Sequence, residues 1–287
     1  MTTLTPAPYP PAPDPNPQAE QMAHESMLRN LAAQAAIIWP GEAALFARYD
    51  VPEQGRVLDV GCGSGEITSR LAGLLPRATL VGLDLLEGPL EHARSAHAAL
   101  APRVSFVQGD AFHLAFPDDT FDLVICRHVT QSVPDPARIL AEMRRVCRPG
   151  GRVHVLSEDY GMLHVAARPG EIDPNRLWRE VLPALSRATG IDERIGRKTW
   201  SLLQAAGLVD VTIDYVVVDT VRAPRAPFAE VLRAWRDGYA AALAEHARLP
   251  EEEVRALFDA GVASILDPAL YSVWHLPILS GRKPERA

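Results

Sequence analysis

Cysteine is scarce in this sequence: 287 residues contain three, and none of them forms a Cys-x-x-Cys pair. Such a chain offers neither a disulfide framework nor a zinc-binding pattern, and it is typical of a reduced, cytoplasmic protein. No run of about 18 apolar residues occurs, so no membrane-spanning helix is predicted. The N-terminus also lacks the basic and apolar regions of a signal peptide.

Positive charge is in deficit as well. Acidic residues number 36 against 29 lysines and arginines, which gives a net charge of −7. A surplus of cations for binding a phosphate backbone is therefore missing, and we expect neither nucleic acid nor membrane among the partners.

One segment stands out because an apolar strand, residues 57–60, stops abruptly at three alternating glycines, Gly61, Gly63 and Gly65. Glycine tolerates positive φ and lets backbone N–H groups approach a ligand closely. Residues 67–75 then have a helical pattern, and a helix N-terminus supplies further unpaired donors and a positive dipole end. The segment predicts a cradle for a nucleotide cofactor; the alternative is a tight turn that binds nothing.

Two common phosphate-binding patterns do not fit this loop. A dinucleotide fingerprint requires a third glycine where Glu66 stands, and a carboxylate there would repel a pyrophosphate. The Gly-x-x-x-x-Gly-Lys-Ser/Thr loop is absent too. The pattern that does occur is Asp-x-Gly-x-Gly-x-Gly from Asp59 to Gly65, and its carboxylate suits a ligand that carries an ammonium and a sulfonium.

Further segments follow in a recognisable order. A strand over residues 78–83 ends at Asp84, a strand over 104–107 leads to Gly109-Asp110-Ala111, and a strand over 121–126 leads to Arg127 and His128. An Arg-Pro-Gly-Gly turn then precedes a strand over 152–156. From about residue 53 to 217, plus a last strand, this order resembles the class I S-adenosylmethionine-dependent methyltransferases, and looks closest to their quinone-biosynthesis-like and natural-product branch.

The alternation of strands and helices favours an α/β fold with a doubly wound, parallel sheet. The resemblance implies a Rossmann-like, mainly parallel seven-stranded sheet with an antiparallel last strand, N-terminal helices and an inserted helical lid. The expected layout is a disordered proline-rich tail over 1–18, N-terminal helices over 19–50, a cofactor-binding domain over 51–225, a lid over 226–268, and the last strand and tail over 269–287.

S-adenosylmethionine is the cofactor that the resemblance implies. Asp84 is then expected to hold the ribose and Asp110 the adenine amino group, although each aspartate could instead cap a turn. These residues fall at the carboxyl ends of successive strands, where ligands bind in open α/β sheets. The full set of expected cofactor contacts is Asp59, Gly61, Cys62, Gly63, Gly65, Asp84, Leu85, Asp110, Ala111 and Arg127.

Helical segments lie outside this frame. Residues 19–49 predict two helices around Pro40-Gly41, and in similar methyltransferases such helices close over the cofactor. Candidates from that segment to line the pocket are Met27, Asn30, Gln34 and Trp39. Residues 227–247 and 251–266 predict a helix pair interpreted as a lid over a small substrate; the alternatives are a structural appendage or a dimer surface, and a homodimer is left open.

Methyl transfer from a sulfonium is an in-line displacement, so the chain needs to position the acceptor and at most to supply a base. His128 directly follows the fourth strand and is the first candidate for that base. Glu158 and Tyr160 follow the fifth strand, with Asp159 between them; His164 and His275 are weaker candidates. We expect no metal, because His128, Asp159 and His164 have irregular spacing.

The acceptor is narrowed by a missing motif. Residues 126–129 read Cys-Arg-His-Val, not the Asn/Asp-Pro-Pro-Tyr/Phe run with which related enzymes grip planar exocyclic amines. The paired acidic set of a magnesium-dependent catechol methyltransferase is also absent. We therefore expect a small organic acceptor methylated on oxygen; the alternatives are an N- or C-methyltransferase of a small metabolite, or a protein that binds S-adenosylmethionine without turnover.

Overall fold

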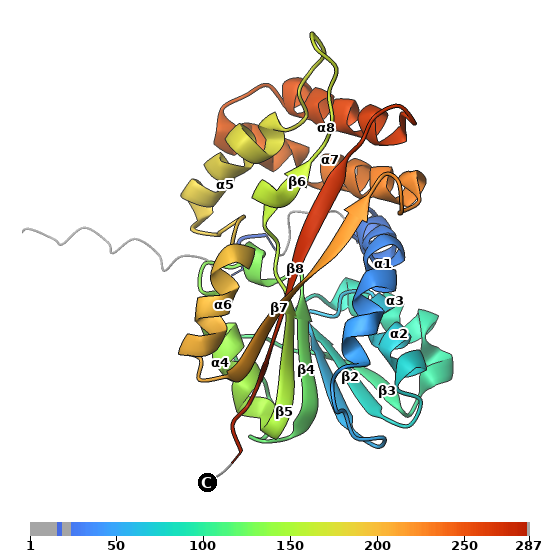
Figure 1. Ribbon diagram of the computed structural model, residues 1–287, viewed down its shortest axis with the longest axis vertical. Helices are drawn as coiled ribbons and strands as arrows, with labels where there is room; N and C mark the ends of the chain where they lie inside the picture. The colour runs from blue at the N-terminus through green and yellow to red at the C-terminus, as the bar shows by residue number, and fades with distance from the viewer. Residues whose placement is uncertain (1–15, 19–23, 286–287) are drawn as a thin grey trace, which may run out of the picture.

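A mixed β-sheet runs the length of the protein in the computed structural model, which describes residues 16–18 and 24–285 (Figure 1). Its strands are β1 (Arg56–Val60), β2 (Thr79–Asp84), β3 (Val104–Gln108), β4 (Phe121–Arg127), β5 (Cys147–Leu156), β6 (Leu163–His164), β7 (Val209–Asp219) and β8 (Val273–Arg282). Its α-helices are α1 (His24–Phe46), α2 (Glu66–Leu74), α3 (Glu87–Ala96), α4 (Pro136–Val146), α5 (Leu182–Thr189), α6 (Gly196–Ala205), α7 (Arg225–Ala247) and α8 (Glu251–Leu266). Shorter turns are η1 (Ala98–Leu100), η2 (Thr130–Ser132), η3 (Tyr160–Met162) and the π-helical η4 (Leu177–Val181).

The strand order is β3-β2-β1-β4-β5-β8, with β7 on the far side of β8. Strands β1 to β5 are parallel, whereas β8 is antiparallel to both β5 and β7. The predicted fold class is confirmed: a doubly wound, mainly parallel sheet with an antiparallel last strand. The structure adds an eighth strand, because the two residues of β6 pair with the start of β8 where it extends beyond β5.

Helices cover both faces of this sheet (Figure 1). Side chains alternate along β1, so Leu58 and Val60 pack with α4 and α6 while Val57 packs with α1, α2 and α3. A third buried cluster joins α5, α7 and α8 to the start of β8, and these helices stand over the carboxyl ends of the parallel strands (Figure 1). The space between them and the sheet is where a ligand is expected in this fold.

The N-terminal segment differs from the sequence prediction. Instead of two helices separated at Pro40, residues 24–46 form one helix that continues through the proline. Proline removes one helical N–H and usually ends a helix, but here packing on both sides of Pro40 holds the helix together. Gly41 lies so close to β7 that a Cβ atom there would be 2.9 Å from Val216 Cγ1, and Glu42 is fully buried against the sheet. The predicted proline-rich tail lies outside the described residues except for 16–18.

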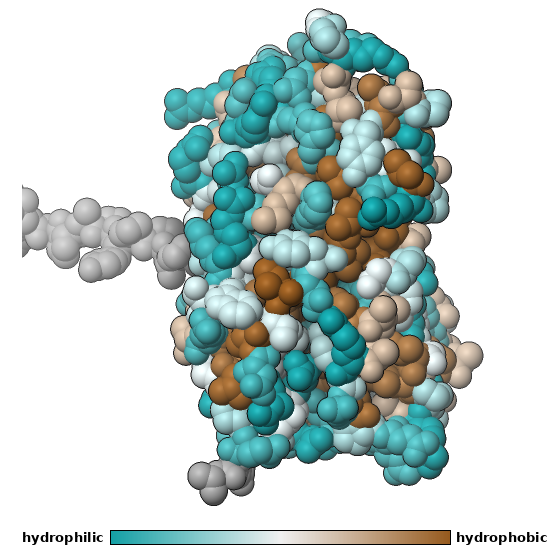
Figure 2. Space-filling view, in the orientation of Figure 1, coloured by the Kyte–Doolittle hydropathy of each residue, from teal (hydrophilic) through white to brown (hydrophobic). Residues whose placement is uncertain are grey.

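Strand β7 forms an edge of the sheet in the described part of the chain. Figure 2 shows hydrophobic side chains among hydrophilic ones on the face that carries it. Val209, Ile213 and Tyr215 of this strand are exposed. Ion pairs of Asp210 with Arg282 and of Asp214 with Arg48 flank these residues, and charges of this kind discourage edge-to-edge pairing. Among the described helices, none has the length and apolar character to cross a bilayer.

Candidate functional site

A cavity lies between the carboxyl ends of the parallel strands and the helices α5, α7 and α8 that stand over them. Most of the predicted site residues line it, namely Asp59, Gly61, Cys62, Gly63, Asp84, Leu85, Asp110, Ala111, Arg127, His128 and Tyr160. Helix α1 adds the predicted Met27, Asn30 and Gln34, whereas Trp39 stacks on Phe46 away from the cavity. Two further predicted residues, Gly65 of the glycine loop and Glu158, do not line the cavity.

The glycine loop has the backbone that its sequence predicts. Gly61, Gly63 and Gly65 have φ angles of 74°, 52° and 75°, values that favour glycine. A Cβ atom at Gly63 would lie 2.6 Å from Leu31 Cδ1 of α1, so the loop and that helix are in close contact. A Cβ atom at Gly65 would meet the Phe106 ring, which shows that Gly65 shapes the turn rather than the cavity surface.

Carboxylates stand at the ends of β1, β2 and β3, as predicted. Asp84 accepts hydrogen bonds from the backbone N–H groups of Gly63 (2.7 Å) and Leu86 (3.0 Å), and burial nevertheless raises its pKa. Asp110 accepts from the N–H of Phe112 at 2.8 Å. The two side chains therefore line the cavity with fixed positions and oxygens that can accept from a ligand.

Asp59 is the most deeply buried of these carboxylates, with 3% of its surface exposed. Burial raises its pKa from the ordinary 3.8 to about 6, against the opposing effect of a 2.6 Å hydrogen bond from Thr68 Oγ1. The folded protein thus holds a proton on Asp59 more tightly than the unfolded chain does. Stability from this group is lost as pH rises from about 4 to 6, because the unfolded state then binds fewer protons than the folded one.

Asp59→Asn is expected to remove that pH dependence. We expect the free energy of unfolding of the variant, minus that of wild type, to increase by ~1–3 kcal/mol between pH 4 and pH 7, because only wild type loses stability over this range. Urea unfolding at a series of pH values measures the difference, with the exposed Asp118→Asn as the matched control. A constant difference between variant and wild type over this range would contradict the assignment.

His128 and Glu158 are brought together by adjacent strands. Strands β4 and β5 pair in register, and the His128 N–H donates to the Leu156 carbonyl, so the residues that follow each strand are neighbours. Nδ1 of His128 lies 2.5 Å from Oε1 of Glu158, which is fully buried. Nε2 of His128 is buried with no hydrogen-bond partner in the described residues. A neutral imidazole that donates from Nδ1 to the carboxylate keeps a free lone pair on Nε2.

The other candidates after β5 have different roles. Tyr160 lies in the cavity wall, stacked on Trp178, and burial raises its pKa well above the usual range. Asp159 is held by two bonds from Arg197, at 2.6 and 2.8 Å, and so fixes α6 in place. His164 and His275 do not line the cavity, and His164 is exposed. The combination of His128, Asp159 and His164 is therefore not assembled.

Arg127 belongs to a buried ionic cluster that sequence reasoning missed. Its guanidinium pairs with Glu42 of α1, with Nε to Oε1 and Nη2 to Oε2 both at 2.8 Å. His154 Nε2 lies 2.9 Å from the same Glu42 Oε1, and Tyr49 caps His154 Nδ1 at 2.8 Å. Burial alone would raise the pKa of Glu42, but the Arg127 charge and the His154 hydrogen bond together lower it to about 2. Arg127 lines the cavity with its charge already balanced, and its contact with a cofactor stays a prediction.

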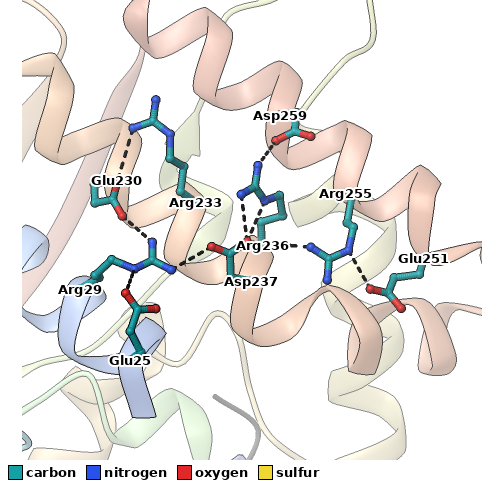
Figure 3. A network of polar contacts seen from close by, with 9 residues as sticks. All are labelled: Glu25, Arg29, Glu230, Arg233, Arg236, Asp237, Glu251, Arg255 and Asp259. Carbon is teal, nitrogen blue, oxygen red and sulfur yellow. Dashed lines mark hydrogen bonds and ion pairs between the residues drawn. The ribbon is translucent and has the colours of Figure 1, made fainter. Parts of the chain in front are cut away.

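A second ionic cluster joins α1 to α7 and α8 (Figure 3). The guanidinium of Arg29 in α1 forms ion pairs with Glu230 and Asp237 of α7, with nitrogen–oxygen distances of 2.5 and 2.9 Å. Asp237 also forms an ion pair with Arg236. Arg236 in turn pairs with Asp259 of α8. These side chains are partly exposed, so each pair adds little stability, but together they fix how α7 and α8 sit on α1.

Comparisons with known proteins find similarity in the central part of the chain. Residues 58–155 match the family described as a methyltransferase domain. The chain is 40% identical over 113 residues to methyltransferase GfsG from Streptomyces halstedii, covering 39% of this chain and 40% of that protein. It is 37% identical over 118 residues to demethylmenaquinone methyltransferase from Deinococcus radiodurans, covering 41% and 48%. The match thus spans less than half the length of these two relatives.

Among solved structures, the chain resembles phosphoethanolamine N-methyltransferase 2 from Haemonchus contortus in complex with S-adenosyl-L-methionine. The TM-score is 0.60 at 17% sequence identity, with 93% of this chain and 59% of that chain covered. At this identity the likeness shows the fold. The residues that match the family run from β1 to β5 and include the glycine loop, Asp84, Asp110 and His128.

Proposed function

We propose that this protein transfers a methyl group from S-adenosylmethionine to an oxygen atom of a small organic acceptor. The starting point is the match of residues 58–155 to the methyltransferase domain family. The observation that carries the proposal is the His128–Glu158 pair at the cavity, with Nε2 of the histidine free to take a proton. A base of this kind matches a hydroxyl acceptor, which must lose a proton on methylation.

The residues of the cavity fit S-adenosylmethionine. The loop glycines leave a cradle that side chains would fill. The wall also holds buried polar atoms that have no hydrogen-bond partner among the described residues, namely the Asn30 and Gln131 amide oxygens and the Ser64 hydroxyl. Asp84 would hold the ribose hydroxyls, Asp110 the adenine amino group, and Asp59 the positively charged end. When bound, the cofactor supplies an electrophilic methyl group on a sulfonium, whose carbon–sulfur bond breaks as the acceptor oxygen forms its new bond.

The chain's own contribution is positioning and proton transfer. His128 Nε2 accepts the acceptor's hydroxyl proton, and the Glu158 carboxylate stabilises the resulting imidazolium through Nδ1–H. Nearly all of the imidazole is shielded from solvent, with 11% of the side chain exposed, so water competes poorly for the base. The cytoplasmic location, the homodimer, the absence of nucleic-acid partners and the lid role of α7 and α8 remain predictions.

The direct test uses methyl-labelled S-adenosylmethionine and a fractionated cell extract. Label in an alkali-stable small molecule, recovered as a methyl ether by mass spectrometry, is the expected result. Label on an amine or a carbon would replace oxygen with nitrogen or carbon as the accepting atom. Label in protein or nucleic acid would overturn the small-acceptor assignment, and cofactor binding without any transfer would favour a binding protein.

Asp84→Ala is expected to weaken cofactor binding by ~1–3 kcal/mol, because hydrogen bonds to a charged group are lost. Isothermal titration calorimetry with S-adenosylhomocysteine measures the change in Kd. Asp118→Ala, which removes an exposed carboxylate, should leave the Kd unaltered. An unchanged Kd for Asp84→Ala would remove this residue from the ribose role.

A further inference from the structure

Five aromatic rings line one part of the cavity, together with the aliphatic side chains of Leu182, Leu185, Ile191 and Leu243. The rings come from η3, η4, α7 and α8 and are Tyr160, Trp178, Trp235, Tyr239 and Phe258. Trp235 also packs edge-on against the buried Trp274, whose ring lies 6.4 Å from that of His128. Trp274 is fully buried and does not line the cavity, so these ring contacts connect the wall to His128 from behind the cavity surface. We name the part of the cavity that the five rings line the acceptor half.

Charged groups are sparse in this half. Of the residues that line the cavity in the described chain, Arg127 is the sole lysine or arginine, and Glu42 already balances its charge. Glu193 faces Arg194 at 3.8 Å. The tyrosine hydroxyls stay neutral at physiological pH, since burial raises the pKa of Tyr239 to about 12. The lining thus lacks a free cation for a phosphate or carboxylate on the acceptor.

The rings also contact one another, which bears on the shape of the ligand. Tyr160 and Trp178 are stacked with centroids 5.9 Å apart, and Trp235 packs edge-on against both at 5.6 and 6.0 Å. A ligand held between two ring faces needs them roughly 7 Å apart, twice the contact distance of carbon atoms. The rings therefore form a packed wall rather than the open cage that recognises quaternary ammonium groups.

We propose that the acceptor is an uncharged, planar aromatic alcohol, a phenol or naphthol, whose ring lies against this aromatic wall and whose hydroxyl meets His128. This inference rests on the proposed function and adds the substrate class. Chemistry favours the same class, because a phenolic hydroxyl, with an ordinary pKa near 10 as in tyrosine, gives its proton to an imidazole far more readily than an aliphatic alcohol does.

Binding of small probes tests the class independently of turnover. Calorimetric titrations of protein saturated with S-adenosylhomocysteine would use 2-naphthol, its saturated non-planar analogue decahydro-2-naphthol, benzyltrimethylammonium and phosphoethanolamine. We expect 2-naphthol to bind at least about tenfold more tightly than each of the others. Equal affinity for the saturated alcohol, or tighter binding of either charged probe, would overturn the proposal.

Variants locate the binding surface. Trp235→Leu is expected to weaken 2-naphthol binding at least about tenfold, whereas Trp200→Leu, at an exposed tryptophan of α6, should leave it unchanged. Because Trp235 is buried, Leu182→Lys provides a second test at a half-buried position of the same cavity, and it should weaken binding to a similar degree. Unaltered binding in folded Trp235→Leu or Leu182→Lys protein would contradict the assignment.

The two proposals fail in different ways. If 2-naphthol binds as expected but neither it nor any extract component acquires label from methyl-labelled S-adenosylmethionine, the substrate-binding surface stands and the catalytic proposal is rejected. If the protein labels an extract component while 2-naphthol does not bind, the catalytic proposal stands and the aromatic class is rejected.

Discussion

His128→Ala is expected to lower kcat by about 10²–10⁴-fold while the Kd for S-adenosylhomocysteine stays within about twofold of wild type. The reason is that the imidazole would accept the acceptor's proton, whereas the glycine loop, Asp59 and Asp84 would hold the cofactor. Steady-state kinetics measures kcat with the acceptor that the labelling experiment identifies, and calorimetry measures the Kd for S-adenosylhomocysteine. His92→Ala removes an exposed histidine of α3 and is the matched control.

Glu158→Gln sharpens this prediction. The amide can still meet Nδ1 but carries no charge to stabilise the imidazolium, so we expect a loss of kcat smaller than that of His128→Ala. Groups that act as one unit are strongly non-additive, and the double variant should therefore be no slower than His128→Ala alone. Full additivity of the two losses, or a His128→Ala protein with wild-type kcat, would show that the pair does not act in proton transfer.

Glu42→Ala is expected to destabilise the protein by ~3–5 kcal/mol at pH 7, because it leaves Arg127 buried without its counter-charge and His154 Nε2 without its hydrogen-bond partner. Urea unfolding gives the free energy. Glu53→Ala is the matched control, since it breaks an ion pair with Arg77 whose side chains are 68% and 56% exposed. That exposed pair should contribute only about 0–1 kcal/mol.

The same cluster has a defined pH dependence. Since the pKa of Glu42 is lowered from 4.5 to about 2 in the folded protein, its stabilising contribution is present above pH 4.5 and is lost as the pH falls toward 2. The gap in unfolding free energy between wild type and Glu42→Ala should therefore narrow below pH 4.5. A gap that stays constant down to pH 3, or a variant as stable as wild type at pH 7, would contradict this account.

The glycine loop and the carboxylates at the strand ends could be predicted from the sequence because local patterns determine them; their contacts with a cofactor stay a prediction. The alternating glycines at 61, 63 and 65 specify a backbone that few other residues adopt, and Asp84 and Asp110 follow their strands directly. In a parallel sheet the carboxyl ends of neighbouring strands meet at one edge, so short segments suffice to bring these residues together. The same rule explains why His128 and Glu158, which follow neighbouring strands, lie together, although their contact was not predicted.

The aromatic wall of the cavity could not be predicted in the same way. Trp178, Trp235 and Phe258 converge only when separate helices fold over the sheet, and an aromatic residue at helical spacing looks like ordinary core. Glu42 was missed for a related reason, since its partner Arg127 lies 85 positions further on and a carboxylate on a helix is usually exposed. Pro40 predicted a helix break because local propensity alone does not register the packing of α1 against β7 and α7.

Helix α1 contacts three parts of the molecule around the cavity. Leu31 contacts the glycine loop, Glu42 balances Arg127 beneath the cavity, and Arg29 binds α7 (Figure 3). We therefore expect the segment that matches the family, residues 58–155, to depend on α1 for part of its stability. A truncated protein that starts at β1 would expose an unpaired arginine and open one side of the cavity, so boundaries for expression or for domain exchange with relatives belong before residue 24.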